Sequence, residues 1–441
     1  MTPHAVEVAD LAISDGIVVE IAGSIFGSAA NELDATGFHL LPGAIDSHVH
    51  FNEPGRTEWE GIATGSRALA AGGATTYVDM PLNSSPPTLT GRDFDAKLAA
   101  AYAASLVDFG FWGGLVAGSQ HTMRELAARG VVGFKGFMCE SGLVEFPRVD
   151  DLTLCEGMQI AAELALPILL HAEDDEITRT LTLRARTEGR VHEVRDYLAT
   201  RPPEAEIQAI GRAIELADAT GCALHIVHVS TEAGADLVVA AAASGVDVSC
   251  ETCPQYLLLS EADMERLGAY AKCGPPPRFD DQPALWEMIA DERIPMVVSD
   301  HSPSSADLKV GLPLLDCWGG ISGCQSTLGL MLEHGHARRG MPLDILCRAV
   351  ASAAATRFRL PGKGALAVGY DADIALVDLG HTFELRSEDL WYRHPQSAYV
   401  GVTHRGRVTR TLVRGMTVFA DAVPASAPVG RLVTPNSPPS N

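Results

Sequence analysis

Short apolar runs alternate regularly with longer alanine-rich stretches through the middle of the chain. Apolar runs bounded by turn residues indicate buried strands, and the stretches between them have the length and composition of helices. Eight candidate strands can be counted, at residues 43–50, 75–80, 106–112, 131–137, 167–171, 224–229, 247–250 and 295–299. Strands that alternate with helices form a parallel sheet, and eight such units are the number that closes a barrel. The sequence therefore predicts an α/β fold with a (β/α)₈ barrel.

The two ends of the chain have a different pattern. Short β-type runs occur there at residues 5–13, 16–25, 373–378, 407–414 and 417–420. Neither end is long enough to form a stable sheet alone. We therefore expect one small β-sandwich domain, built from residues 1–42 and 362–421, beside a barrel of residues 43–361. Residues 422–441 are rich in proline and serine, which predicts a loose C-terminal tail.

Charge and cysteine content exclude several functional classes. Lys and Arg number 33 against 56 Asp and Glu, so the formal charge is −23. A surface this acidic repels phosphate backbones and anionic lipid headgroups, which argues against nucleic-acid and membrane partners. The nine cysteines do not suggest a disulfide scaffold, and Cys250 and Cys253 lack the second pair of a structural zinc site. With no signal-peptide pattern in residues 1–14 and no apolar run of about 18 residues, we expect a cytoplasmic protein.

Polar residues follow several of the predicted strands at the same end. His48 and His50 end the first strand and, being two residues apart, face the same side. His171, His228 and Asp300 end the fifth, sixth and eighth strands. Any one of these histidines is explained by a hydrogen bond to a backbone carbonyl in the core. Four histidines and an aspartate at matched positions favour a metal site at the end where barrel enzymes bind substrate.

Lys135 lies in the fourth strand, where alternation directs it into the barrel. An unpaired ammonium beside metal cations is strongly unfavourable. One explanation is that Lys135 extends outward or pairs with a carboxylate. The other is that its neutral amine reacts with CO₂, giving an anionic carbamate whose two oxygens bridge two metals about 3.5–4 Å apart. Two divalent ions, the carbamate, Asp300 and a hydroxide then sum to a charge of about +1, which suits a developing oxyanion.

Taken together, these residues resemble the amidohydrolase superfamily, and within it the cyclic amidases. The matching segments are 42–50 (PGAIDSHVH), 133–135 (GFK), His171, His228, 299–303 (SDHSP) and 364–374 (GALAVGYDADI). The resemblance extends from about residue 5 to about residue 421. It implies that His48, His50 and Asp300 bind a buried metal and that His171 and His228 bind a more exposed one. It also implies that Lys135 is carboxylated and bridges the two.

Further segments are similar to the allantoinase family. They are residues 51–61 (FNEPGRTEWEG), 79–83 (DMPLN) and 317–321 (CWGGI). Dihydroorotases usually carry an arginine two positions after the second histidine to bind a carboxylate, and Asn52 stands there instead. Hydantoinases usually carry a tyrosine after the carbamate strand, where this chain has residues 139–141 (CES). The resemblance therefore implies hydrolysis of the hydantoin ring of allantoin to allantoate, a step in purine breakdown.

The resemblance also implies cofactors, substrate contacts and an assembly. Two divalent ions, zinc first and otherwise cobalt, manganese, iron or nickel, would activate a hydroxide between them. Asp300 would accept its proton and pass it to the departing ring nitrogen. Substrate contacts are expected at Asn83, Gly274, Gly320 and His301, although Asn83 is equally explained as a turn residue and His301 as a group that orients Asp300. His225 shares the face of His228 and is a candidate to support a ligand. A homotetramer is expected.

Three other functions stay open. A hydantoinase or dihydropyrimidinase of broad range is the nearest alternative, and a dihydroorotase is disfavoured by Asn52. The third alternative is a non-catalytic scaffold, because this superfamily includes relatives that have lost metal ligands. The presence of all six candidate ligands argues against that role.

Overall fold

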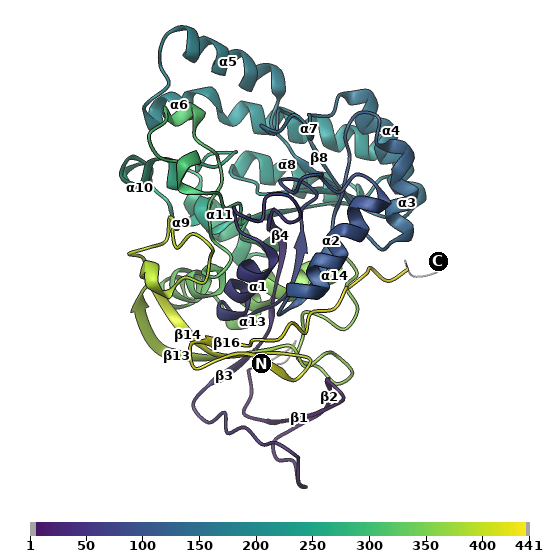
Figure 1. The fold of residues 1–441 in the computed structure, drawn as a ribbon, viewed down its shortest axis with the longest axis vertical. Helices are drawn as coiled ribbons and strands as arrows, with labels where there is room; N and C mark the ends of the chain where they lie inside the picture. The colour runs from purple at the N-terminus through teal and green to yellow at the C-terminus, as the bar shows by residue number, and fades with distance from the viewer. Residues whose placement is uncertain (1–5, 438–441) are drawn as a thin grey trace.

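The computed structural model describes residues 6–437 (Figure 1). Parallel strands form the central barrel, and in chain order they are β4 (Ala44–Val49), β5 (Ala74–Asp79), β6 (Asp108–Phe111), β7 (Gly113–Gly114), β8 (Phe134–Phe137), β9 (Ile168–His171), β10 (Leu224–Ile226), β11 (Val248–Thr252) and β12 (Met296–Val297). β6 and β7 are two parts of one strand interrupted at Trp112, whose backbone N–H donates to the Asp79 carbonyl at 3.0 Å. Each of the eight expected strands is present, so the predicted barrel is confirmed.

The last strand closes the barrel against the first. Val49 forms a parallel bridge with His301, which follows β12. The backbone N–H of His50 donates to the His301 carbonyl at 2.8 Å. This pairing places the ends of the first and eighth strands side by side.

Helices surround the barrel and fill the connections between its strands (Figure 1). They are α1 (Ile62–Ala71), α2 (Gly91–Ala104), α3 (Met123–Ala128), α4 (Asp151–Glu163), α5 (Asp175–Thr187), α6 (Val194–Thr200), α7 (Pro203–Thr220), α8 (Glu232–Ala243), α9 (Pro254–Leu258), α10 (Glu261–Leu267), α11 (Gln282–Ala290), α12 (Thr327–Leu330), α13 (Leu343–Cys347) and α14 (Ala353–Arg357). The longest, α7, begins with a proline in its first turn and ends at Gly221, whose φ of 67° suits a glycine. None of the helices in residues 6–437 combines the length and apolar character needed to cross a membrane.

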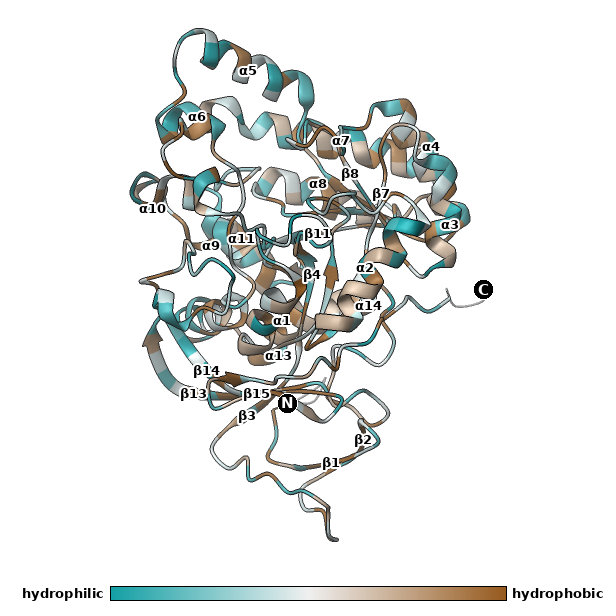
Figure 2. Cartoon of the chain, in the orientation of Figure 1, coloured by the Kyte–Doolittle hydropathy of each residue, from teal (hydrophilic) through white to brown (hydrophobic). Residues whose placement is uncertain are grey.

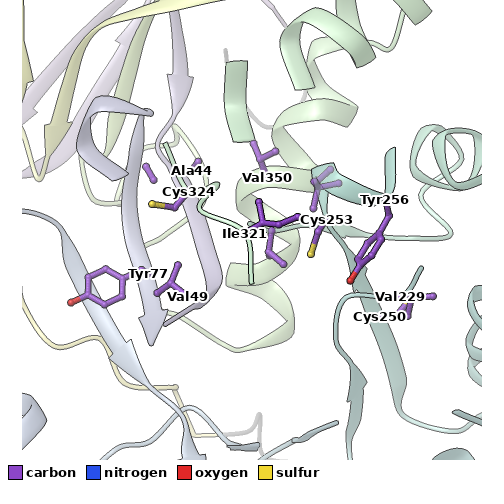
Figure 3. Packing of buried hydrophobic residues seen from close by; sticks show 14 of the residues in the cluster. Ala44, Val49, Tyr77, Val229, Cys250, Cys253, Tyr256, Ile321, Cys324 and Val350 are labelled. Carbon is purple, nitrogen blue, oxygen red and sulfur yellow. The ribbon is translucent and has the colours of Figure 1, made fainter. Parts of the chain in front are cut away.

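Hydrophobic residues gather on the barrel strands, whereas α4 and α5 carry many hydrophilic residues (Figure 2). The main buried cluster continues from the barrel into the surrounding helices. Figure 3 shows part of it, where Ile321 lies near Val350 and Cys253. This packing gives the strand ends a rigid base.

A second sheet combines both ends of the chain. Its five antiparallel strands are ordered β16 (Val423–Pro424), β15 (Met416–Ala420), β14 (Thr403–Val413), β13 (Ile374–Glu384) and β3 (His39–Pro42). A separate hairpin consists of β1 (Asp10–Ser14) and β2 (Ile17–Ala22). The β domain built from both termini is thus confirmed, and its expected residues 1–5 lie outside the described residues.

The C-terminal segment differs from the loose tail expected for residues 422–441. The Phe109 N–H donates to the Arg431 carbonyl at 3.0 Å, and the Val433 N–H donates to the Phe109 carbonyl at 2.7 Å. Val433 itself is buried. Backbone groups at the edge of β6 need partners, and this segment supplies them. Composition alone did not reveal these pairings, and residues 438–441 lie outside the described residues.

A buried ionic cluster joins the barrel to the β domain. The ammonium of Lys363 donates to Asp108 at 2.5 Å and to Asp373 at 2.8 Å, and lies 2.8 Å from Asp371. Arg414 pairs with the other oxygen of Asp108. Burial alone lowers the pKa of Lys363, but the three carboxylates outweigh it and hold that pKa well above its usual value. The cluster therefore contains two cations and three carboxylates, and Lys363 is the cation that contacts all three.

We expect Lys363→Met to lower the free energy of unfolding by about 3–5 kcal/mol, because Asp371 and the buried Asp373 lose their cation and Asp108 keeps only Arg414. Urea denaturation followed by circular dichroism measures the change. Arg124→Met, in an exposed pair with Glu163, is the control and should cost less than about 0.5 kcal/mol. Equal losses in the two variants would contradict the assigned role of the cluster.

Candidate metal and active site

Six polar residues expected to bind metal lie at the C-terminal ends of the barrel strands. All are at most 8% exposed: His48, His50, Lys135, His171, His228 and Asp300. The imidazole rings form a continuous row, with centroid distances of 5.5 Å from His48 to His50, 5.4 Å from His48 to His228, and 4.6 Å from His228 to His171. The structure thus brings residues from the ends of five separate strands to one place.

Asp300 faces the two histidines of the first strand. Its Oδ1 lies 3.3 Å from Nε2 of His48 and 3.5 Å from Nε2 of His50. One ligand atom from each of these three residues lies within 4.8 Å of the others, so they can share a metal ion. The backbone φ is 45° at Asp300 and 40° at His228. Such positive values are rare outside glycine and are concentrated at functional sites.

Lys135 lies deep in the barrel without a polar partner. Its side chain is fully buried, and its Nζ makes no hydrogen bond. The described residues offer it no carboxylate within salt-bridge distance. Its Nζ lies 5.1 Å from the centre of the Phe137 ring. Burial lowers the pKa of the amine to about 7. Neither the outward orientation nor the carboxylate pairing considered from the sequence is present.

His171 is oriented by a buried carboxylate. Its Nε2 lies 2.8 Å from Oε2 of Glu173, which also accepts a hydrogen bond from Arg201 at 2.8 Å. The imidazole stacks on Phe137, with centroids 4.6 Å apart and an interplanar angle of 12°. The neighbouring His228 has a buried Nδ1 without a partner. Burial lowers the pKa of both histidines, so each is neutral and has a lone pair to offer.

Glu251 is a central residue of the site that the sequence analysis missed. Its two oxygens lie 2.6 Å from Nδ1 of His48 and 3.1 Å from Nε2 of His225. Nδ1 of His225 lies 2.8 Å from Oγ of Ser249. Burial raises the pKa of Glu251 to about 8. In its ionised form the carboxylate only accepts hydrogen bonds, and Nδ1 of His48 then carries the proton while Nε2 keeps its lone pair. Ser249 and Glu251 alternate on β11, but this alternation alone does not reveal which residues Glu251 contacts.

The donor set fits divalent metal ions. It contains four imidazoles and one carboxylate, which are ligands of zinc and related metals. The unpartnered atoms on Lys135 and His228 are buried polar groups that a ligand would satisfy. Two other groups of possible ligands do not fit a cation as well. Arg201 lies beside the group of Cys139, His171 and Glu173, and Lys363 fills the group of Asp108, Asp371 and Asp373.

Three of the expected substrate contacts lie on loops at this end of the barrel. An added Cβ at Gly274 would lie 3.7 Å from Cε1 of His171. Asn83 has a φ of 39°, and its amide donates to Oγ of Ser302 at 3.4 Å. At Gly320, an added Cβ would lie 2.2 Å from the Ser302 carbonyl, so no side chain fits. Asn83 and Gly320 therefore meet at the same residue of the loop after Asp300.

The ring of His301, the fourth expected contact, is engaged elsewhere. Its Nδ1 accepts a hydrogen bond from the Gly323 N–H at 3.1 Å, and its Nε2 faces Glu60 at 3.7 Å. Its ring packs against Tyr392 with centroids 4.9 Å apart. The ring is fully buried among these groups. The expected substrate contact at His301 stays a prediction, and its backbone carbonyl closes the barrel.

Comparisons with known proteins agree with this architecture. The model of the amidohydrolase family matches residues 39–418. The allantoinase of Rubrobacter xylanophilus is 54% identical over 97% of this chain and 94% of its own length, and that of Desulfitobacterium hafniense is 49% identical over 98% and 96%. Among solved structures, an L-hydantoinase (dihydropyrimidinase) from Arthrobacter aurescens superposes with a TM-score of 0.95 at 31% identity, covering 98% of this chain and 97% of that one. The chain belongs to the amidohydrolase family, in the branch that contains the allantoinases and hydantoinases.

Proposed function

We propose that this protein hydrolyses the hydantoin ring of allantoin to give allantoate. As a member of the family it is a metal-dependent cyclic amidohydrolase. The observation that carries the proposal is the group of four buried histidines, Asp300 and an unpartnered buried lysine at the barrel mouth. Relatives 54% and 49% identical over nearly the whole chain, both named allantoinase, support the substrate.

We propose that two divalent ions bind between the strand ends. His48, His50 and Asp300 would hold one, and His171 and His228 the other. Such ions polarise a carbonyl and lower the pKa of bound water, which supplies the nucleophile for hydrolysis. Zinc suits this set of ligands, with cobalt, manganese, iron and nickel as competitors.

Lys135 would bridge the two ions as a carbamate. Its Nζ forms a bond to the carbon of CO₂ and releases a proton, which gives a planar anion with two oxygen ligands. The buried amine has no other partner, and its lowered pKa leaves a neutral fraction able to react. The modification turns an unfavourable buried cation beside metal ions into a favourable anion.

The remaining steps fall to residues of this chain. Asp300 would accept a proton from the attacking water and deliver it to the departing ring nitrogen. Glu251 keeps His48 in one tautomer, and Glu173 does the same for His171. The backbone at Gly274, the carbonyl of Gly320 and the amide of Asn83 would hold the cyclic amide. The ureido and imide groups of allantoin are neutral and suit such partners.

A hydantoin or dihydropyrimidine substrate is the second candidate. It is favoured by the TM-score of 0.95 to a hydantoinase. A dihydroorotate substrate is disfavoured at Asn52, whose buried amide donates to the Pro303 carbonyl at 3.3 Å and brings no positive charge. We also propose a cytoplasmic homotetramer acting in purine breakdown, on the resemblance to the family.

Steady-state kinetics on metal-quantified enzyme test the substrate. We expect kcat/KM for (S)-allantoin to exceed that for hydantoin, dihydrouracil and dihydroorotate by at least about tenfold, because polar groups that bind the ureido arm would be left unpaired by the others. Removal of the metals with a chelator should abolish the activity, and added metal should restore it. A higher kcat/KM for hydantoin or dihydrouracil would refute the proposed substrate.

Replacement of the bridging lysine tests the carbamate. Lys135→Ala should lose at least one of two metal ions per chain and lower kcat/KM at least about 100-fold, because the bridging ligand is gone. Elemental analysis measures the metal, and a short carboxylic acid should partly restore the rate. Lys363→Met, another buried lysine far from the strand ends, should keep both ions. Full metal content with a near-normal rate in Lys135→Ala would overturn the carbamate.

Glu251 provides a separate test of the ligand geometry. We expect Glu251→Leu to weaken metal binding about 10–100-fold, because Nδ1 of His48 loses its acceptor. Competition with a chromogenic chelator measures this affinity. Glu251→Gln keeps one acceptor oxygen and should lose less, and Ser249→Ala, which removes only the contact to His225, should bind metal nearly as wild type. Unchanged affinity in Glu251→Leu would contradict the role of this carboxylate.

A further inference from the structure

A long loop follows directly after the catalytic candidate Asp300. Residues 303–320 contain only two short 3₁₀ turns, η3 (Ala306–Leu308) and η4 (Leu314–Asp316). Both ends of the loop are fixed, because the Ser302 N–H donates to the Ile321 carbonyl at 2.9 Å and Ile321 lies in the buried cluster (Figure 3). Long loops at this end of a barrel usually serve the active site.

Two buried lysines link the loop to the segment that faces it, residues 269–274. Lys309, on the loop, donates from Nζ to the carbonyls of Ala269 at 3.1 Å, Trp318 at 3.2 Å and Gly320 at 2.7 Å. The link runs in both directions, because Lys272 on the facing segment reaches back into the loop.

Lys272 contacts the loop through its side chain and its backbone. Its Nζ donates to the carbonyls of Leu315 at 3.1 Å and Cys317 at 2.6 Å. Its backbone carbonyl accepts from the Gly320 N–H at 2.7 Å. The two lysines therefore hold the second half of the loop, from Leu315 to Gly320.

Neither ammonium has a counterion. Lys272 is 6% exposed and Lys309 is 5% exposed. Within residues 6–437, no carboxylate lies at salt-bridge distance from either one, whereas the buried Lys363 has three. Burying a cation against carbonyl oxygens alone costs free energy that an apolar side chain of the same length would not. Stability alone therefore does not explain why both positions are lysines. Their hydrogen bonds to loop carbonyls, which fix the geometry of the loop, do explain it.

The facing segment leads directly to the candidate metal ligands. Tyr197 donates from Oη to the Cys273 carbonyl at 2.6 Å, and Nζ of Lys272 lies 5.0 Å from the Tyr197 ring centre. The next residue is Gly274, whose added Cβ would lie 3.7 Å from Cε1 of His171. The lysines thus connect Gly320 on one loop with Gly274 on another, beside His171.

We propose that Lys272 and Lys309 are positioning residues, a clamp of two buried ammonium groups. The clamp holds the loop 303–320 against residues 269–274, so that the Gly274 backbone and the remaining lone pair of the Gly320 carbonyl face the cyclic amide. The proposal deepens the proposed function and rests on it for the identity of the substrate. The clamp acts on substrate binding, and the proton transfer by Asp300 does not depend on it.

Lys309→Met and Lys272→Met, each loaded with metal, test the clamp. We expect the KM for allantoin to rise at least tenfold with a smaller change in kcat and with two metal ions per chain retained. Lys363→Met is the matched control, since it removes a buried ammonium from the other end of the barrel. It should lower the melting temperature and leave KM unchanged. A KM within twofold of wild type in both clamp variants would overturn the proposal.

Thiol labelling gives a readout that is independent of activity. Cys317, on the same loop, is 5% exposed, and its Sγ lies 3.4 Å from the Lys309 carbonyl. Loosening the loop should raise the labelling rate of Cys317 at least tenfold, as followed by peptide mass spectrometry. Cys222, which is buried beside β10, should label at the wild-type rate. Unchanged labelling of Cys317 would overturn the clamp.

Two further variants keep the test decisive if a methionine variant does not fold. Lys309→Gln keeps N–H donors on a shorter side chain, so it should raise KM and Cys317 labelling in the same direction by a smaller factor. Lys309→Arg keeps both charge and donors and should lie closest to wild type. Wild-type behaviour of Lys309→Gln in both assays would refute the clamp. If the wild type does not hydrolyse allantoin, the proposed function fails, and the labelling of Cys317 still decides on the clamp.

Discussion

The hydrogen bond from the His50 N–H to the His301 carbonyl closes the barrel, and the candidate site depends on that closure. It joins the first strand to the last, so that Asp300 lies 3.3 Å and 3.5 Å from the Nε2 atoms of His48 and His50. Without it, the candidate ligands from the two ends of the barrel sequence would not meet. The same carbonyl explains why His301 matters although its ring is directed to Gly323 and Glu60.

Buried charge is divided between the two ends of the barrel. At the end that meets the β domain, Lys363 is matched by three carboxylates, and the cluster stabilises the contact between domains. At the other end, Lys135, Lys272 and Lys309 are buried without carboxylate partners in the described structure. Unmatched buried groups cost stability, and they persist where a site requires them.

Much of the fold and of the candidate site could be predicted from the sequence. Apolar runs predicted all eight strands, and the polar residues that follow them marked the candidate ligands, whose roles stay predictions. Other features were missed or wrong. Glu251 was overlooked, because one acidic residue in a strand carries no signal until its neighbours are known. The expected loose tail was wrong, because its composition does not show that backbone groups of residues 429–433 pair with β6 and Ser105.

The sequence by itself determined which elements form and which residues stand at their ends, because strand and helix periodicity depends only on neighbours along the chain. Only the tertiary structure decided the partners. His48 and Glu251 are 203 residues apart, and only barrel closure brings them to 2.6 Å. Lys309 finds the Ala269 carbonyl in the same way. Hydrogen bonds and charge pairing act over a few ångströms, so their partners are set by the packed fold and not by position in the sequence.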